Sequence, residues 1–518
     1  MNFFATSNIT ALALCAGAFL LCTEIQAQQS KKRVKLIHTD NLLYDKALVD
    51  AQRLIGSVQL EYEGTMFYSD SAYLYANDDF DAFSNIRIVK PGTYNVTGDL
   101  GHFNKQQNTA TLTNNVTLRD SDMTLTTNYL TFNTNTEIAT YAGGGKIVSN
   151  ANHNTLTSDR GIYHSKTDVF FFRKNVVLKN PDYTVNCDTM QYNNLSEITY
   201  FFGPTTIAGD DSEIYCENGY YNTKKDQSRF GKNARVRSEK TLLTGDSIYY
   251  DGEAGFGEVF RNVTIRDTTE NFLISGQYGK HIEGTKLSFV TQRALLSQFF
   301  EADTLFLHAD TLKAVPDSMG RKIVYAYHRV KFFKHDIQGK CDSLVYSQAD
   351  STMQMFVQPV MWSMQTQITG DSISLQTANG EMQSMLVKGN AFIISDAEAK
   401  GDSIKTTNDR YNQIKGRKLT GTFTENELRN VYVEGNGQLI YFPTNDEQAK
   451  PLAMGHNKGE CSNINITIDD RKFSRIRMET ETNSKFSPMN LSDETHFKLD
   501  GFNWREGERP KLMMDIFE

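Results

Sequence analysis

A repeat of about 30 residues constrains this chain more than any other feature of its sequence. An Asp, or a residue in its place, recurs at intervals of 29 to 33 residues, in segments such as GDSIYY around Asp246. The thirteen anchor positions are Asp40, Asp70, Asp99, Asn128, Asp159, Asp188, Glu217, Asp246, Gln277, Asp310, Asp342, Asp371 and Asp402. Such a regular period over most of the 518 residues predicts one elongated repeat array rather than several globular domains.

Each anchor is followed by an apolar pair. An aliphatic or small residue stands two positions later and a mostly aromatic or aliphatic residue four positions later, as Ile248 and Tyr250 do after Asp246. Residues two apart on a strand point to the same face of a sheet. The pairs therefore predict an apolar ladder along one face.

A second motif, N-V-x-Φ with Φ apolar, follows each anchor by about half a repeat. Its two apolar positions again lie two residues apart, so they form a second ladder. We take them as candidate lining residues of an apolar groove: Ile86, Ile88, Val116, Leu118, Val176, Leu178, Ala234, Val236, Val263, Ile265, Val330, Phe332, Val360, Trp362, Ala391 and Ile393.

Turn signals such as YANDD, NNLSE and YDGEAG separate two extended runs in each repeat. The Gly before several anchors (Gly98, Gly245, Gly370, Gly401) indicates a bend between two sheets. The predicted fold is all-β: an elongated array of antiparallel strands in an open, two-sheet jellyroll that grows by one hairpin per repeat. At about 4.8 Å per strand, such an array is on the order of 100 Å long.

Two cysteines test the hairpin. Cys187 and Cys216 each precede an anchor, so they occupy equivalent places on successive repeats. A repeat of one strand would place them close enough for a disulfide, whereas an intervening antiparallel strand separates them by roughly 9.6 Å. We expect the intervening strand, and therefore two unpaired thiols.

The ends of the chain differ from the array. Residues 1–27 are expected to be a signal peptide with an apolar core at Ala11–Leu21 and cleavage after Ala27, and Leu21 argues against a lipid anchor on Cys22. The repeats divide into an N-terminal part, 28–200, and a continuing part, 201–445. Residues 446–518 are more polar, with one last hairpin and partial disorder expected.

Charge and motifs exclude several functions. The net charge is −8 without a basic stripe, which argues against nucleic acid as a partner. The chain has no CxxC pair, no calcium-binding nonapeptide repeat and no common catalytic motif, so we expect no metal, no cofactor and no enzyme activity. An acid on nearly every repeat is better explained by turn structure than by catalysis.

The ladders have two interpretations. The sheets could close on each other, making the ladders an ordinary core, or splay apart and hold acyl chains between them. Composition alone favours a core, the commoner use of apolar columns.

A family resemblance changes this balance. The segments LIHTDNLLYDK and LIGSVQLEYEGTMFYSDSAYLY, the recurring GDSIxY and GNVxI elements, and GNGQLIYF resemble OstA-like proteins over about residues 36–480. This family includes the periplasmic lipopolysaccharide bridge LptA and the periplasmic part of LptD. The resemblance implies a V-shaped, open β-jellyroll that carries the acyl chains of lipid A, and end-to-end joining of such units across the periplasm.

The expected function is that of a periplasmic bridge for lipopolysaccharide transport and outer-membrane assembly. The expected partners are lipopolysaccharide, other lipopolysaccharide-transport proteins, a separate outer-membrane barrel and further copies of the chain. Only about 75 residues follow Phe442, too few for a barrel of at least eight strands. Two rivals stay open: a structural or adhesive β-solenoid with a closed core, and a polysaccharide-cleaving parallel β-helix, which the evenly short turns disfavour.

Overall fold

The computed structural model describes residues 33–120, 123–149, 154–267, 271–301, 303–378, 381–397, 410–425, 427–445, 452–469, 472–491 and 497–518. The expected signal peptide, Gly401 and the last anchor, Asp402, lie outside these residues. Within them, no helix has the length and apolar composition to cross a membrane.

Strands account for most of the described chain, because β-branched and aromatic residues alternate with polar ones between short turns. The first half contains β1 (Lys35–His38), β2 (Asn41–Tyr44), β3 (Gln52–Tyr62), β4 (Thr65–Leu74), β5 (Phe80–Lys90), β6 (Tyr94–Asn104), β7 (Thr109–Arg119), β8 (Met123–Asn133), β9 (Ile138–Ser149), β10 (Thr155–His164), β11 (Val169–Lys179), β12 (Tyr183–Asn193), β13 (Ile198–Gly209), β14 (Ser212–Asn222), β15 (Gln227–Ser238), β16 (Thr241–Asp251) and β17 (Phe256–Asp267).

The second half contains β18 (Phe272–Ile282), β19 (Leu287–Phe299), β20 (Thr304–Pro316), β21 (Lys322–Phe333), β22 (Ile337–Ser347), β23 (Thr352–Phe356), β24 (Val360–Ser363), β25 (Thr366–Thr369), β26 (Ser372–Ala378), β27 (Glu381–Asp396), β28 (Tyr411–Thr424), β29 (Glu427–Tyr441), β30 (Thr444–Asn445), β31 (Leu452–Ala453), β32 (Gly455–Asp469), β33 (Lys472–Glu479) and β34 (Asn483–Pro488). In the described residues that follow, the chain forms three short 3-10 helices, η1 (Met489–Leu491), η3 (Glu506–Glu508) and η4 (Met513–Phe517).

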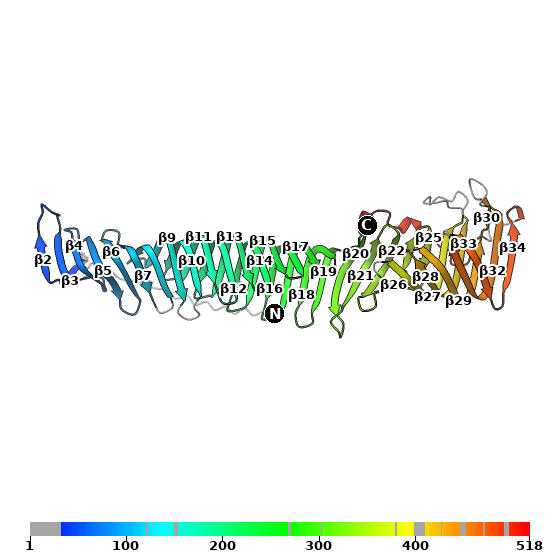
Figure 1. Cartoon of the computed structure of the whole chain (residues 1–518), viewed down its shortest axis with the longest axis horizontal. Helices are drawn as coiled ribbons and strands as arrows, with labels where there is room; N and C mark the ends of the chain where they lie inside the picture. Colours follow the sequence, from blue (N-terminus) through cyan, green and yellow to red (C-terminus); the bar gives the residue numbers. More distant parts are fainter. Residues whose placement is uncertain are drawn as a thin grey trace, which may run out of the picture.

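The strands form one long antiparallel array, as predicted (Figure 1). Thirty-two of the described strands belong to a single sheet, and β30 and β31 form a separate pair. Each repeat contributes one hairpin. Thr205 on β13 pairs with Cys187 on one side and with Cys216 on the other, and both thiols are unpaired. The hairpin topology is therefore confirmed.

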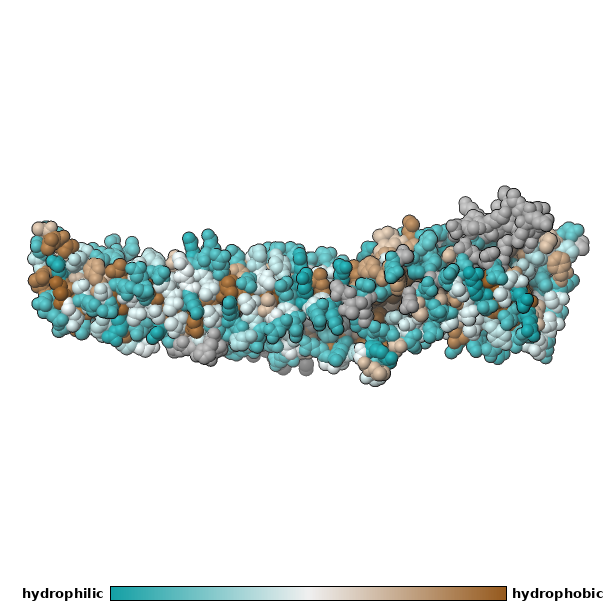
Figure 2. Space-filling view, in the orientation of Figure 1, coloured by the Kyte–Doolittle hydropathy of each residue, from teal (hydrophilic) through white to brown (hydrophobic). Residues whose placement is uncertain are grey.

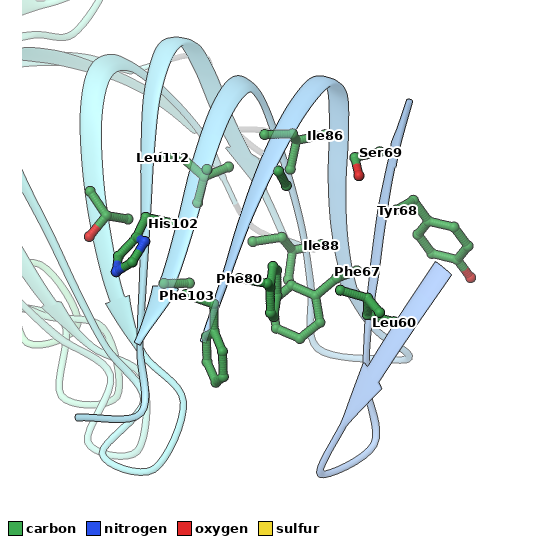
Figure 3. Close-up of a pocket in the computed structure, with 14 residues that line it drawn as sticks. Leu60, Phe67, Tyr68, Ser69, Phe80, Ile86, Ile88, His102, Phe103 and Leu112 are labelled. Carbon is green, nitrogen blue, oxygen red and sulfur yellow. The ribbon is translucent and has the colours of Figure 1, made fainter. Parts of the chain in front are cut away.

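A bulge in the middle of each long strand pair folds this sheet lengthwise. Asn114 and Asn115 of β7, both with positive φ, stand opposite the single anchor Asp99 of β6. Such bulges bend and twist a strand, and here they lie one above another along the array. We call this line the spine. In Figure 3 the ribbons curve over near Ile86, which directly follows a bulge, and then descend on the other side.

The spine divides the sheet into two arms. Arm A holds the residues that follow an anchor and precede a bulge, and arm B holds those that precede an anchor and follow a bulge. Every long strand therefore belongs to both arms. The two facing sheets predicted from the sequence are two halves of one folded sheet.

The glycines before the anchors lie beside the spine, at the bend that the sequence predicts. Gly98 and Gly245 lie inside strands and Gly370 lies between β25 and β26, and none of the three has a positive φ. A Cβ on Gly245 would lie 2.4 Å from Cγ1 of Val259, and one on Gly370 would lie 2.4 Å from Cγ1 of Val387. Gly245 and Gly370 therefore make room for a neighbouring valine beneath the spine, where the bulges bend the sheet.

The interior forms two successive cores. One runs from Val34 to Val263 and the other from Val290 to Ile468. A third, smaller cluster lies outside the folded sheet, where Phe392 and Ile440 pack against Phe497 and Leu499. Residues 497–518, which we call the C-terminal strap, thus pack on the array, although their sequence suggests partial disorder.

Candidate functional site

The space between the arms contains most of the candidate lining residues. Fourteen of the sixteen face it: Ile86, Ile88, Val116, Leu118, Val176, Leu178, Ala234, Val236, Val263, Ile265, Val330, Phe332, Ala391 and Ile393 belong to the two interior cores or pack against them. They form one continuous ladder because every bulge is followed by the same inward-facing position.

Val360 and Trp362 are the exceptions. Trp362 pairs with Gln338 and Met361 with Gly339, and it is Met361 that joins the interior core. The bulge here is Val357 with Gln358, so the ladder positions fall on Pro359 and Met361. A shift of one residue moves a side chain to the opposite face. Val360 and Trp362 therefore lie on the exterior of arm B.

The N-terminal part of the groove is filled by aromatic side chains. Phe103 packs against Phe67 and Phe80 with ring centroids 5.4 and 5.1 Å apart, and Tyr62 lies 5.2 Å from Phe103. Figure 3 shows these phenylalanines pointing between the arms, below Ile86 and Ile88. The cavity left among them is about 10 Å³. This stretch is a closed core.

Two polar contacts also join the rims of the arms in this part. The hydroxyl of Tyr62 at the end of arm B donates to Oδ1 of Asn108 in a turn of arm A, over 2.9 Å. Nζ of Lys90 in arm B lies 2.9 Å from Oε1 of Glu137 in arm A. The hydrogen bond from Lys90 lowers the pKa of the Glu137 carboxyl, so this bridge is charged at neutral pH.

The middle of the groove, from β11 to β18, is more open. Next to the spine, Val176, Ala234 and Val263 are buried, at 1% exposure or less. The groove opens on the side opposite the spine, and we call this opening the mouth. The ladder partners nearer the mouth are half-buried, namely Leu178, Val236 and Ile265. These three side chains therefore offer apolar surface that can be reached through the mouth.

Tyrosines line the opposite wall of this middle stretch. Tyr192, Tyr221 and Tyr250 are half-buried on the inner face of arm A. The hydroxyl of Tyr221 donates to Asp226 over 3.1 Å, and that of Tyr250 to Glu283 over 2.9 Å. Burial, together with the bond to Asp226, raises the pKa of Tyr221 to about 12. The rings add apolar surface, and the hydroxyls bind acids at the rim.

The C-terminal part is tightly packed again. Val387, Ile414 and Val433 are fully buried, and the cavity between the arms there is about 60 Å³, lined in part by Ile368 and Leu428. The groove thus has a half-open middle between two closed ends.

Sequence reasoning missed how the two motifs of the repeat are linked. The side-chain amide of Asn115 donates to the carboxylate of Asp99 over 2.6 Å, and that of Asn175 to Asp159 over 3.0 Å. The anchor acids thus bind the Asn of the N-V-x-Φ motif on the next strand. The constant spacing of about 16 residues between the two motifs is the signal that could have revealed this pair.

No group of three or more His, Cys, Asp or Glu in the described chain is arranged to hold a metal ion. The inner cysteines are also poor nucleophiles, because burial raises the pKa of Cys187 to about 12 and that of Cys216 to about 11. Apolar contact is what the inner surface offers.

The sequence model of the family described as OstA-like protein matches residues 31–188 and 184–246. No curated protein matches the chain. Thirteen chains of solved structures match; one is LptH, the LptA-homologous periplasmic component of the lipopolysaccharide transport device of Pseudomonas aeruginosa, at 18% identity and a TM-score of 0.18, covering 19% of this chain and 75% of that one. The similarity to OstA-like proteins thus covers residues 31–246 of this chain.

Proposed function

We propose that this protein is a periplasmic bridge for lipopolysaccharide and that its groove holds the lipid's acyl chains between β11 and β18. The half-buried apolar strip of Leu178, Val236 and Ile265 is the observation that carries this proposal. Each methylene group that leaves water there contributes about 0.8 kcal/mol. Seven strand spacings of about 4.8 Å give this stretch a length of about 34 Å.

The closed ends limit where a lipid can lie. The aromatic residues around Phe103 and the residues around Ile414 leave cavities of about 10 and 60 Å³. A lipid in the middle stretch would leave its sugars outside the mouth, next to rim acids such as Asp226 and Glu283. Binding there involves no chemical reaction, in keeping with a carrier rather than an enzyme.

The N-terminal edge of the array supports association with another protein. Among the described strands, β1 and β2 pair only with β3, so their outer edges are unpaired. Ile37 and Tyr44 at this edge are 53% and 60% exposed, and Figure 2 shows hydrophobic surface at that end. An unpaired apolar edge can add a strand from another chain.

The opposite edge is different, because β33 and β34 present Arg475, Arg477 and Lys485. Charges of this kind discourage strand addition. We therefore place the contact with a further copy, or with another lipopolysaccharide-transport protein such as an outer-membrane barrel, at β1 and β2. Export by the N-terminal signal peptide would bring the chain to the periplasm.

Mass spectrometry of lipid that co-purifies from the native envelope tests the function. We expect a glycolipid with acyl chains, and we expect Val236→Glu to abolish its recovery because the change puts a charge inside the groove. The matched control is Arg235→Glu, since Arg235 is exposed on the outer face of the same strand. An absence of lipid, or equal loss from both variants, would favour the structural or adhesive solenoid.

A further inference from the structure

The exterior of arm B is apolar over one restricted area. Phe392, Ile394, Ile440 and Phe442, together with Tyr411, form a cluster that the strap covers with Phe497 and Leu499. In the middle of the array, the same exterior carries residues such as Thr206, Arg235 and Thr264. The sequence therefore makes this part of the exterior suitable for burial, independently of the groove on the other side of the sheet.

Two glutamines hold the strap by its main chain. Nε2 of Gln413 donates to the carbonyl of Phe497 over 2.6 Å, and its Oε1 accepts from the amide of Leu499 over 2.8 Å. Gln367 repeats this arrangement with the carbonyl of Asn503 at 2.8 Å and the amide of Arg505 at 2.6 Å. Each side-chain amide thus binds backbone groups two residues apart, as a neighbouring strand would.

The strap continues across further strands toward the middle of the array. Oε1 of Gln338 on β22 accepts from Nε of Arg509 over 2.8 Å, and Nζ of Lys340 lies 2.6 Å from Glu508. The ring of Phe517 packs against that of His308 on β20, with their centroids 4.7 Å apart and their planes tilted by 50°. In sequence order the strap therefore crosses arm B from β28 to β20, and Figure 1 shows its end beside β20.

The fit between the strap and arm B is incomplete. Nε1 of Trp362, which is fully buried, and both carboxylate oxygens of Glu506 are buried without a hydrogen-bond partner in the described chain. Buried polar groups in a permanent core are almost always paired. The carboxylate of Glu506 has only ion pairs within the strap, to Arg509 and Lys511 at 3.7 Å, and the indole N–H of Trp362 has no partner among the described residues, so the strap leaves polar groups of this contact unsatisfied.

The groove is closed in the half that the strap crosses. On strands that it crosses, the mouth-side ladder residues Phe332 and Ile393 are 1% and 2% exposed, whereas the equivalent Leu178 and Val236 in the middle of the array are half-buried. We propose that the exterior of arm B between β20 and β28 is a peptide-binding face, that the strap is its removable occupant, and that occupancy holds this half of the groove closed. The proposal rests on the proposed function only in treating the space between the arms as a groove.

Tryptophan fluorescence can measure whether the strap is bound. Its two tryptophans, Trp362 and Trp504, both lie at this contact, with Trp504 5.1 Å from the ring of Tyr411. In the full chain, we expect Gln367→Ala with Gln413→Ala to shift tryptophan emission to the red. The matched control, Gln191→Ala on the outer face of arm A, should leave it unchanged.

Distances across the mouth test the effect on the groove. Encoded spin labels at Met364 and Glu425 bracket the mouth in the strapped half, and labels at Asp210 and Lys224 bracket it in the middle. In the double glutamine variant we expect the first distance to lengthen and broaden and the second to stay unchanged. A red shift without any change between 364 and 425 would overturn the proposed control of the groove.

A second variant separates the face from its occupant. Phe497→Asp with Leu499→Asp should release the strap and leave the face intact. A free peptide of residues 497–518 should then bind and restore the 364–425 distance, but it should not do so when Gln367 and Gln413 are also alanine. Failure of the peptide to bind, or binding that ignores the glutamines, would overturn the peptide-binding face. No lipid is needed, so the outcome is independent of the lipid cargo.

Discussion

Asn262 donates its side-chain amide to the carboxylate of Asp246, 3.0 Å away and 16 residues earlier in the chain. Asn262 and Arg261 form a bulge with φ of 50° and 55°, and Asp246 is the single residue opposite them. The same pair recurs as Asn85 with Asp70 at 2.8 Å and as Asn390 with Asp371 at 3.1 Å. One repeated contact thus links the two sequence motifs and fixes the fold line of the sheet.

Removing the amide should weaken the spine locally. Asn262→Ala loses a charge-assisted hydrogen bond and places a residue with a Cβ but no polar group at positive φ, which we expect to cost about 1–3 kcal/mol. Because repeat arrays open locally, hydrogen exchange of β16 to β18 is the appropriate measurement. The control is Asn186→Ala, at an exposed strand position. Equal protection from exchange in both variants would show that the hydrogen bond between Asn262 and Asp246 is dispensable.

Replacing a glycine beneath the spine with a larger residue should lower the stability of the array. In Gly245→Ala the new methyl group would lie 2.4 Å from Cγ1 of Val259, and overpacking of this kind costs about 1–3 kcal/mol. Gly284→Ala is the control, because no atom lies within 4 Å of its Cβ position. Adding Val259→Ala should recover part of the loss in a denaturation series. Full stability of Gly245→Ala alone would contradict the close packing.

The inner cysteines should be inert in the folded protein. Burial raises the pKa of Cys187 to about 12 and of Cys216 to about 11, so little thiolate exists at pH 8. We expect slow modification by a maleimide and rapid modification after denaturation, as read by mass spectrometry. A Cys187–Cys216 disulfide in peptide mapping would contradict the intervening strand β13.

Acid should loosen the strap. Hydrogen bonds from Arg505, aided by Lys340, lower the pKa of Glu508 to about 2, below its ordinary value of 4.5. The ion pairs of Glu508 with Arg505 and Lys340 therefore stabilise the strap above about pH 4.5, and this contribution is lost as the pH falls toward 2. Tryptophan emission should shift to the red over this range, and Glu508→Gln should reduce the shift attributable to this pair. An identical acid transition in the variant would exclude Glu508 as its cause.

The period of the sequence made the hairpin array and most of the groove predictable, because alternation alone decides which residues share a face. Val360 and Trp362 were misplaced because the segment VQPVMW lacks the Asn of the motif, so its bulge lies one residue earlier than the apolar pattern suggests. The strap was not predictable. The glutamines that hold its main chain lie at least 84 residues away in the sequence, and no local pattern encodes such contacts.

Photo-crosslinking to lipopolysaccharide tests the central claim most directly. Crosslinkers at Leu178, Val236 and Ile265 face the half-open groove, and those at Val177, Arg235 and Thr264 are their neighbours on the exterior of arm B. We predict strong capture of lipopolysaccharide by the first set and little by the second. Equal capture by both sets, or capture by neither in cells that are transporting lipopolysaccharide, would contradict a lipid-carrying groove.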